Sequence, residues 1–210
     1  MRVTETTIQN ALYHFLRQRG VWPILPNIDC VTGYEADILT ITKSGYAHEY
    51  EIKLTLSDFR ADLKKRHKHA SFSGEFKTVP NPFYKSQFPD RYPETIDVLK
   101  DSVASTAWAI LSDQCHPGRK PKRFWYVVHG FDVPTADIPS YAGLMKYIPK
   151  AHWSCAFDVV KKAPDLDAKP ANEQHIRHAA ENMLFRYWAL RTKERQEAEV
   201  EHEETERIIQ

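Results

Sequence analysis

Apolar residues at helical spacing open the chain, and an alternating pattern follows them. An amphipathic helix is predicted over about residues 4–19, with Thr4 as its cap and Gly20 as its stop signal. Its apolar positions are Ile8, Leu12, Phe15 and Leu16. A proline-punctuated link, VWPILPN, leads to two strand-like runs, ADILTIT and YAHEYEIKL. The residues between these runs, 43–45, end in a glycine that suits a short loop, so the pattern predicts an antiparallel hairpin.

Beyond the hairpin, the pattern predicts a helix, an insertion and two buried strands. The helix is expected to be capped by Ser57 and to run to about His69. Residues 71–122 carry six prolines among aromatic residues, which indicates a long insertion with one short helix near 94–111. The continuous apolar runs RFWYVVHG, at 123–130, and HWSCAFDVV, at 152–160, are typical of strands inside a sheet.

A last helix is predicted from about residue 172, with an apolar stripe on one side. The stripe consists of Ile176, Ala180, Met183, Leu184, Tyr187 and Leu190. Residues 194–206 then hold seven glutamates and one arginine, a composition typical of a solvated helix or a frayed tail. The predicted organisation is one domain over 1–170, followed by a C-terminal helix with an acidic tail over 171–210.

The hairpin places charged residues on a face that would ordinarily be apolar. With a loop of 43–45, residues whose numbers sum to 88 stand opposite each other, so Asp37 faces Glu51. Alternation puts one charged set on the same face: Glu35, Asp37, Glu49, Glu51 and Lys53. Opposed carboxylates repel by roughly 0.2 to 1 kcal/mol when exposed, and Mg²⁺ neutralises such a pair. The pattern therefore predicts a metal site, with Lys53 close enough to stabilise charge on a phosphate. Alternating Glu and Lys are also common on solvated surface strands.

This order of elements resembles the PD-(D/E)XK nuclease superfamily: a helix, an Asp in a hairpin, then Glu-Ile-Lys on the next strand and another helix. The stretch YEADILTITKSGYAHEYEIKLTLSDFRADLKKRHKH, with RFWYVV and IPSYAGLMKY later, is similar to phage and bacterial members linked to DNA repair. The resemblance covers about residues 1–70 and 122–163. It implies an α/β fold of the restriction-endonuclease-like kind, a mixed β-sheet flanked by helices. Ala36 stands where the superfamily's name has proline.

The resemblance also implies roles for individual residues. By position, Asp37, Glu51 and the backbone carbonyl of Ile52 would bind Mg²⁺ or Mn²⁺, and Lys53 would be the catalytic lysine. Many relatives add a glutamate from the first helix, for which Glu5 is the candidate, although the helix dipole also favours an acid there. The implied activity is metal-dependent hydrolysis of DNA phosphodiester bonds in repair, recombination or phage DNA processing.

Charge is balanced over the whole chain but not locally. With 29 basic and 28 acidic residues, the net charge of +1 gives no sign of a polyanionic partner. Between Lys53 and Ala70, however, the sequence contains six Lys or Arg residues and only two Asp residues. Basic charge beside a metal site suits a phosphate backbone, although a solvated helix face would look similar. The predicted DNA contacts are Arg60, Lys64, Lys65 and Lys68.

Other signals narrow the class of protein. The three cysteines form no CxxC pair, which argues against a disulfide framework and a zinc ribbon and suits a reducing cytoplasm. The chain has no apolar leader and no run of 18 apolar residues, so we expect neither secretion nor membrane insertion. Two rival functions stay open: a nucleic-acid-binding module of the same fold that does not cut, and a protein-interaction scaffold that works through its acidic helix. A homodimer is among the assemblies that the sequence allows.

Overall fold

The computed structural model describes residues 2–28, 34–80, 95–99, 120–149 and 156–209. The chain forms two compact units, Met1–Ala171 and Asn172–Gln210, each of which is described by itself. Among the residues that the structure describes, no helix is long and apolar enough to cross a membrane.

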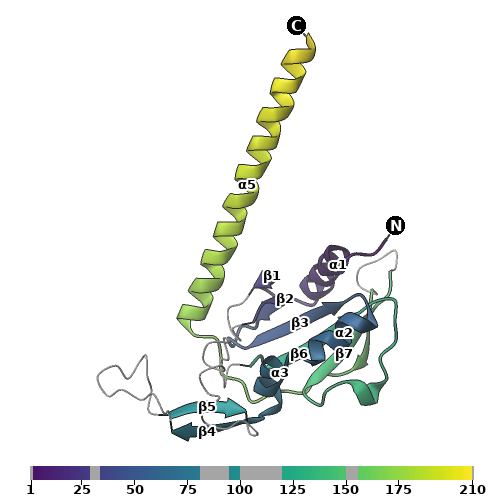
Figure 1. The fold of residues 1–210 in the computed structure, drawn as a ribbon, viewed down its shortest axis with the longest axis vertical. Helices are drawn as coiled ribbons and strands as arrows, with labels where there is room; N and C mark the ends of the chain where they lie inside the picture. The colour runs from purple at the N-terminus through teal and green to yellow at the C-terminus, as the bar shows by residue number, and fades with distance from the viewer. Residues whose placement is uncertain (1, 29–33, 81–94, 100–119, 150–155, 210) are drawn as a thin grey trace, which may run out of the picture. The chain divides into compact units, whose positions relative to one another are not determined.

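The first unit is built on a six-stranded mixed sheet with the order β1-β2-β3-β6-β7-β8 (Figure 1). Its strands are β1 (Ile24–Ile28), β2 (Ala36–Ile41), β3 (Ala47–Lys53), β6 (Arg123–Val128), β7 (Ala142–Tyr147) and β8 (Phe157–Lys161). The pairings β3–β6 and β6–β7 are parallel, and the other three are antiparallel. A separate two-stranded sheet consists of β4 (Phe76–Pro80) and β5 (Thr95–Leu99).

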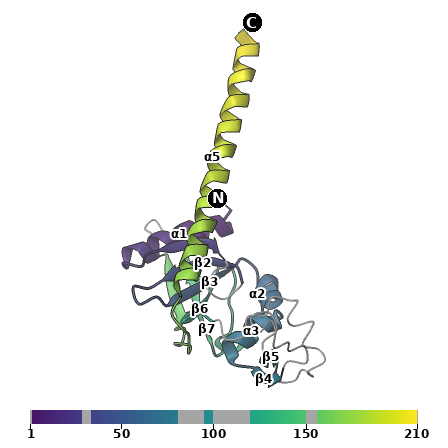
Figure 2. The same cartoon turned by 90° about the vertical axis from the view of Figure 1, so that its left-hand side faces the viewer.

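Helices cover both faces of the six-stranded sheet. The helix α1 (Glu5–Gln18) packs on one face, and α2 (Leu56–Leu63) and α3 (Arg66–Ser73) pack on the other (Figure 2). The apolar side of α1 contacts Tyr50 and Ile52 of β3. Phe59 of α2 and Phe72 of α3 pack against β6. A short 3₁₀ helix, Thr135–Asp137, lies between β6 and β7. Strand β3 is therefore buried on both faces.

Several predictions about local structure are confirmed. Thr4 caps α1, since its hydroxyl accepts a hydrogen bond from the backbone N–H of Thr7. The hairpin has the predicted register, with Ile38 opposite Tyr50. Gly45 closes its loop with a φ of 83°, a conformation that favours glycine. The strand predicted at 123–130 is β6.

The single helix expected from Ser57 to His69 was wrong. Two helices lie there, and Thr55 caps the first of them by accepting a hydrogen bond of 3.1 Å from the backbone N–H of Asp58. The helix is interrupted because two other groups contact the backbone carbonyl oxygen of Asp62. That oxygen accepts from the N–H of Lys65 and lies 2.8 Å from the His69 ring, so the regular helical ladder ends there.

Strands β1 and β5 lie where the sequence analysis predicted a link and a helix. Strand β1 lies in the segment predicted as a link, where Pro26 is tolerated because an edge strand can lack one N–H donor. Strand β5 occupies the start of the helix expected near 94–111, and its β-branched residues favour extended backbone. The rest of that helix, 100–111, and the start of the strand expected at 152–160 lie outside the described residues.

The second unit is one helix, α5 (Glu173–Ile209). It begins beside Asn172, whose side-chain oxygen accepts a hydrogen bond of 2.9 Å from the backbone N–H of His175. The predicted C-terminal helix is thus confirmed, and it continues through the acidic run.

Candidate functional site

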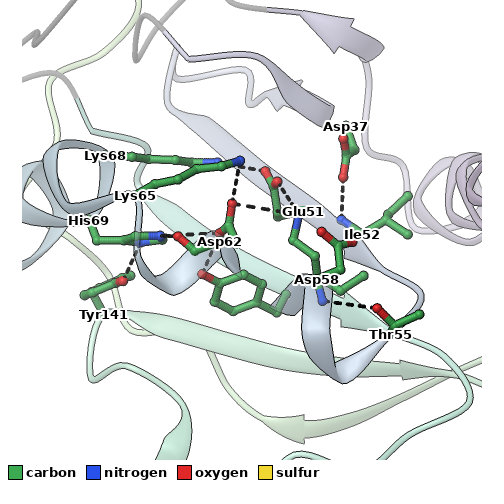
Figure 3. Close-up of polar contacts among 12 residues, drawn as sticks. Asp37, Glu51, Ile52, Thr55, Asp58, Asp62, Lys65, Lys68, His69 and Tyr141 are labelled. Atoms are coloured by element: carbon green, nitrogen blue, oxygen red, sulfur yellow. Dashed lines mark hydrogen bonds and ion pairs between the residues drawn. The ribbon is translucent and has the colours of Figure 1, made fainter. Parts of the chain in front are cut away.

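Asp37 and Glu51 come from neighbouring strands, one residue beyond the paired residues Ile38 and Tyr50, and Glu51 is close enough to raise the pKa of Asp37. Oδ2 of Asp37 accepts a hydrogen bond of 2.6 Å from the backbone N–H of Ile52 (Figure 3). Burial raises the pKa of Asp37 to about 7, and the charges of Glu51 and Glu5 add to the effect, against the hydrogen bond from Ile52. The raised pKa of Asp37 therefore comes first from burial and second from the two neighbouring acids.

Helix α1 brings further polar groups to Asp37. Nε2 of Gln9 lies 3.2 Å from Oε1 of Glu5, 2.8 Å from Oδ1 of Asn27 and 3.3 Å from the carbonyl oxygen of Asp37. Glu5 is exposed and Asp37 is half-buried, so this side of the site faces water. The predicted helical glutamate is thus near the predicted strand aspartate. Gln9 was missed, although its place one turn after Glu5 was a signal.

Glu51 lies between two buried lysines. Nζ of Lys53 is 2.7 Å from Oε1, and Nζ of Lys68 is 2.8 Å from Oε2. Burial opposes the charged form of each lysine, but the surrounding acids, with Glu51 first among them, together outweigh it and raise the pKa of both. Lys68 was predicted as a DNA contact beside the metal site. The structure places its side chain inside the site, where only 3% of it is exposed and its partner is Glu51.

Asp62 of α2 is a second carboxylate in this cluster, and its side chain is 1% exposed. Oδ2 accepts a hydrogen bond of 2.9 Å from the hydroxyl of Tyr126, and Oδ1 lies 2.9 Å from Nζ of Lys65 and 3.8 Å from Nζ of Lys53. Burial opposes ionisation of Asp62. Hydrogen bonding from His69 and the surrounding lysine charges outweigh burial and hold the pKa of Asp62 well below its usual range.

His69 ties α3 to the cluster. Its Nε2 lies 2.8 Å from the backbone carbonyl of Asp62, and its Nδ1 lies 2.6 Å from the hydroxyl of Tyr141 (Figure 3). Because a carbonyl only accepts, Nε2 donates and Nδ1 accepts the Tyr141 hydrogen. These two hydrogen bonds hold α3 in position, and with it the neighbouring residue Lys68. The sequence offered no signal for Tyr141, which approaches from a distant part of the chain.

The other predicted DNA contacts lie on the surface. Arg60 and Lys64 are exposed, and Lys65 is 59% exposed although its ammonium holds Asp62. These three residues come from α2 and the turn after it, next to the buried cluster. Their contact with DNA stays a prediction.

The carboxylates of the site supply part of the ligand set of a hard divalent cation. Mg²⁺ takes one or two carboxylates together with water and phosphate oxygens, and Asp37 and Glu51 supply two carboxylates. Within the described ranges, no group of three or more His, Cys, Asp or Glu residues is arranged to hold a metal. Both oxygens of Glu51 also contact lysines, so a cation would share Glu51 with Lys53 and Lys68.

Fold and site together define a mixed α/β protein with an acid–lysine cluster on the central strand of its sheet. The SPO1766 protein of unknown function from Silicibacter pomeroyi is similar in structure, with a TM-score of 0.50 and 17% sequence identity over 92% of this chain and 96% of that chain. Comparison with family models gave no match, and comparison with curated proteins gave none either. The structural similarity concerns the fold alone.

Proposed function

We propose that the protein is a divalent-metal-dependent nuclease of the restriction-endonuclease-like fold that hydrolyses phosphodiester bonds in DNA. One observation carries the proposal. Asp37 and Glu51 approach each other from adjacent strands, in surroundings that raise the pKa of Asp37 to about 7, and Lys53 lies 2.7 Å from Glu51 on the same strand. Two acids brought together are stabilised by a positive charge beside them, and perturbed acids of this kind gather at functional sites.

The proposal gives each residue a role. Asp37, Glu51 and the carbonyl of Ile52 would hold Mg²⁺ or Mn²⁺, which supplies Lewis acidity and lowers the pKa of water when bound. Lys53, kept charged by Glu51, would stabilise negative charge that develops on the phosphate. Glu5 would add a further acid at the exposed side of Asp37.

The exposed basic residues beside the cluster would hold the DNA. Arg60, Lys64 and Lys65 would contact phosphates, which positions a duplex or a single strand without reading its sequence. Binding should therefore weaken as salt is raised.

The test is cleavage of single-stranded, duplex and branched DNA with Mg²⁺ or Mn²⁺. We expect wild type to cleave at least one form, and Asp37→Asn and Lys53→Met to lose about a hundredfold or more of the rate. Asp132→Asn is the matched control, because Asp132 is an exposed acid whose partner, Lys146 of β7, is separated from β3 by strand β6. Absence of cleavage by wild type in every combination, or full activity in Lys53→Met, would contradict the proposal.

A second candidate is a nucleic-acid-binding module that does not cut. The observation in its favour is that Lys53 and Lys68 contact both oxygens of Glu51, which neutralises that acid without any ion. This candidate predicts salt-dependent DNA binding without cleavage. It also predicts equal Mn²⁺ affinity for wild type and Asp37→Asn, whereas the nuclease proposal predicts weaker binding by the variant.

A further inference from the structure

The first half of α5 exposes a large apolar surface. Six large apolar side chains there are each half exposed or more: Ile176, Leu184, Phe185, Tyr187, Trp188 and Leu190. Apolar residues gathered in this way mark an interaction site on a soluble protein. A single helix also gains most of its stability from packing its apolar side against another element.

The spacing of these residues indicates what covers them. Alternate steps of four and three residues connect three of them, Ile176, Tyr187 and Leu190, in one series that also contains Ala180 and the half-buried Met183. This is the heptad spacing of a seam between two paired helices. Phe185 stands apart, since it lies about 200° around the helix from Met183.

Charge is divided along the same helix. Residues 172–193 contain four Lys or Arg residues and two Glu residues, whereas residues 194–209 contain seven Glu residues and two Arg residues. In a parallel pair of these helices, the acidic segments would lie side by side and repel. In an antiparallel pair that overlaps along the seam, they point away from each other.

We propose that two copies of the chain pair through this seam in antiparallel orientation, with the two Met183 residues at the centre. Ile176 of one copy then lies near Leu190 of the other, and Glu194 lies near residue 172, where the partner helix begins. The N-terminal end of a helix carries partial positive charge, so this alignment also brings the first glutamate of each acidic segment to a favourable place. The pairing is independent of the proposed nuclease activity.

The first test is the mass of the full-length protein by sedimentation equilibrium over roughly a hundredfold range of concentration, because dimers follow mass action. We expect a dimer for wild type and a monomer for the double variant Met183→Glu, Tyr187→Glu. Phe185→Glu is the matched control, with the same new charge on the other side of the helix, and should stay dimeric. A monomeric wild type, or equal dissociation by Phe185→Glu, would overturn the proposal.

The second test measures orientation and needs no disruptive variant. Ile176→Cys and Leu190→Cys are mixed and oxidised, and the linked peptides are identified by mass, with wild type as the background for Cys30, Cys115 and Cys155. The antiparallel pair predicts a link between positions 176 and 190. A predominant 190–190 link would indicate a parallel pair, and absence of both links would indicate another occupant, such as a basic protein. Either result would refute the proposal.

Discussion

Replacing Asp62 with asparagine is predicted to destabilise the first unit by about 3 kcal/mol at neutral pH. Asparagine has nearly the same size, so the substitution removes a charge and leaves the packing in place. The charge lies 3.8 Å from the buried ammonium of Lys53 and 2.9 Å from the exposed ammonium of Lys65. Without it, Glu51 is left to compensate two buried lysines.

The magnitude follows from how each partner is buried. Removing one member of a buried ion pair typically costs about 3 to 5 kcal/mol. Lys65 is 59% exposed and can turn to water, and Glu51 still contacts Lys53 and Lys68, so the lower end applies. A loss of about 3 kcal/mol is roughly a hundredfold in the folding equilibrium.

The loss should depend on pH with a defined sign. The pKa of Asp62 is lower in the folded protein than its unfolded value of about 4. Its carboxylate therefore stabilises the fold fully above that pH, and the contribution is lost as the pH falls through the folded pKa. The difference between wild type and Asp62→Asn should be largest at neutral pH and should shrink below about pH 4.

The assay is urea unfolding followed by near-UV circular dichroism, which reports the packing of buried aromatic residues. Asp132→Asn is the control, because its exposed pair with Lys146 should contribute less than about 1 kcal/mol. A loss below about 1 kcal/mol for Asp62→Asn at pH 7, or an equal loss at pH 3, would refute this account of the buried cluster.

Three further predictions test other parts of the fold. Thr55→Ala should cost about 1 kcal/mol in urea unfolding because it removes the cap of α2, whereas Ser57→Ala should have little effect. Gly143→Ala should cost about 1 to 3 kcal/mol, since the added carbon would lie 2.5 Å from the ring of Trp125, and a wild-type midpoint would contradict that packing. Asp37→Asn should stabilise the protein, because the raised pKa of about 7 in the folded state means that ionised Asp37 destabilises the fold increasingly from about pH 4 to 7. The gain in unfolding free energy should therefore grow over that range and then level off.

The hairpin could be predicted from sequence because its determinants are local. Gly45 sets the loop, the loop sets the register, and the register decides which side of β3 each residue faces. The side-by-side placement of Asp37 and Glu51 follows from these local facts alone. Helix α1 could be predicted from the sequence equally well, since Thr4 and the apolar spacing mark its start and its buried side.

The other half of the site depends on contacts between distant segments. Asp62 meets Tyr126, and His69 meets Tyr141, across separations of 64 and 72 residues. No periodic pattern in the sequence predicts these contacts, and a run of basic residues such as KKRHKH is typical of a solvated surface. The contacts end α2 early and turn Lys68 inward, which is why the expectation of one long helix was wrong.

The charges around β3 are arranged unevenly, and this bears on the choice between the two candidate functions. On the side of α2 and α3, Asp62 is surrounded by lysines, and its pKa is held low. Asp37 lies near Glu51 and Glu5, and burial together with these two acids raises its pKa to about 7, against the charge of Lys53. Asp37 is only half-buried, so water and a cation have access to its carboxyl. A cation held there by Asp37 could leave Lys68 on Glu51, so the contacts of Glu51 with lysines do not argue against metal binding. The decisive residue is Asp37, because only the nuclease proposal gives its carboxylate a metal ion as a partner.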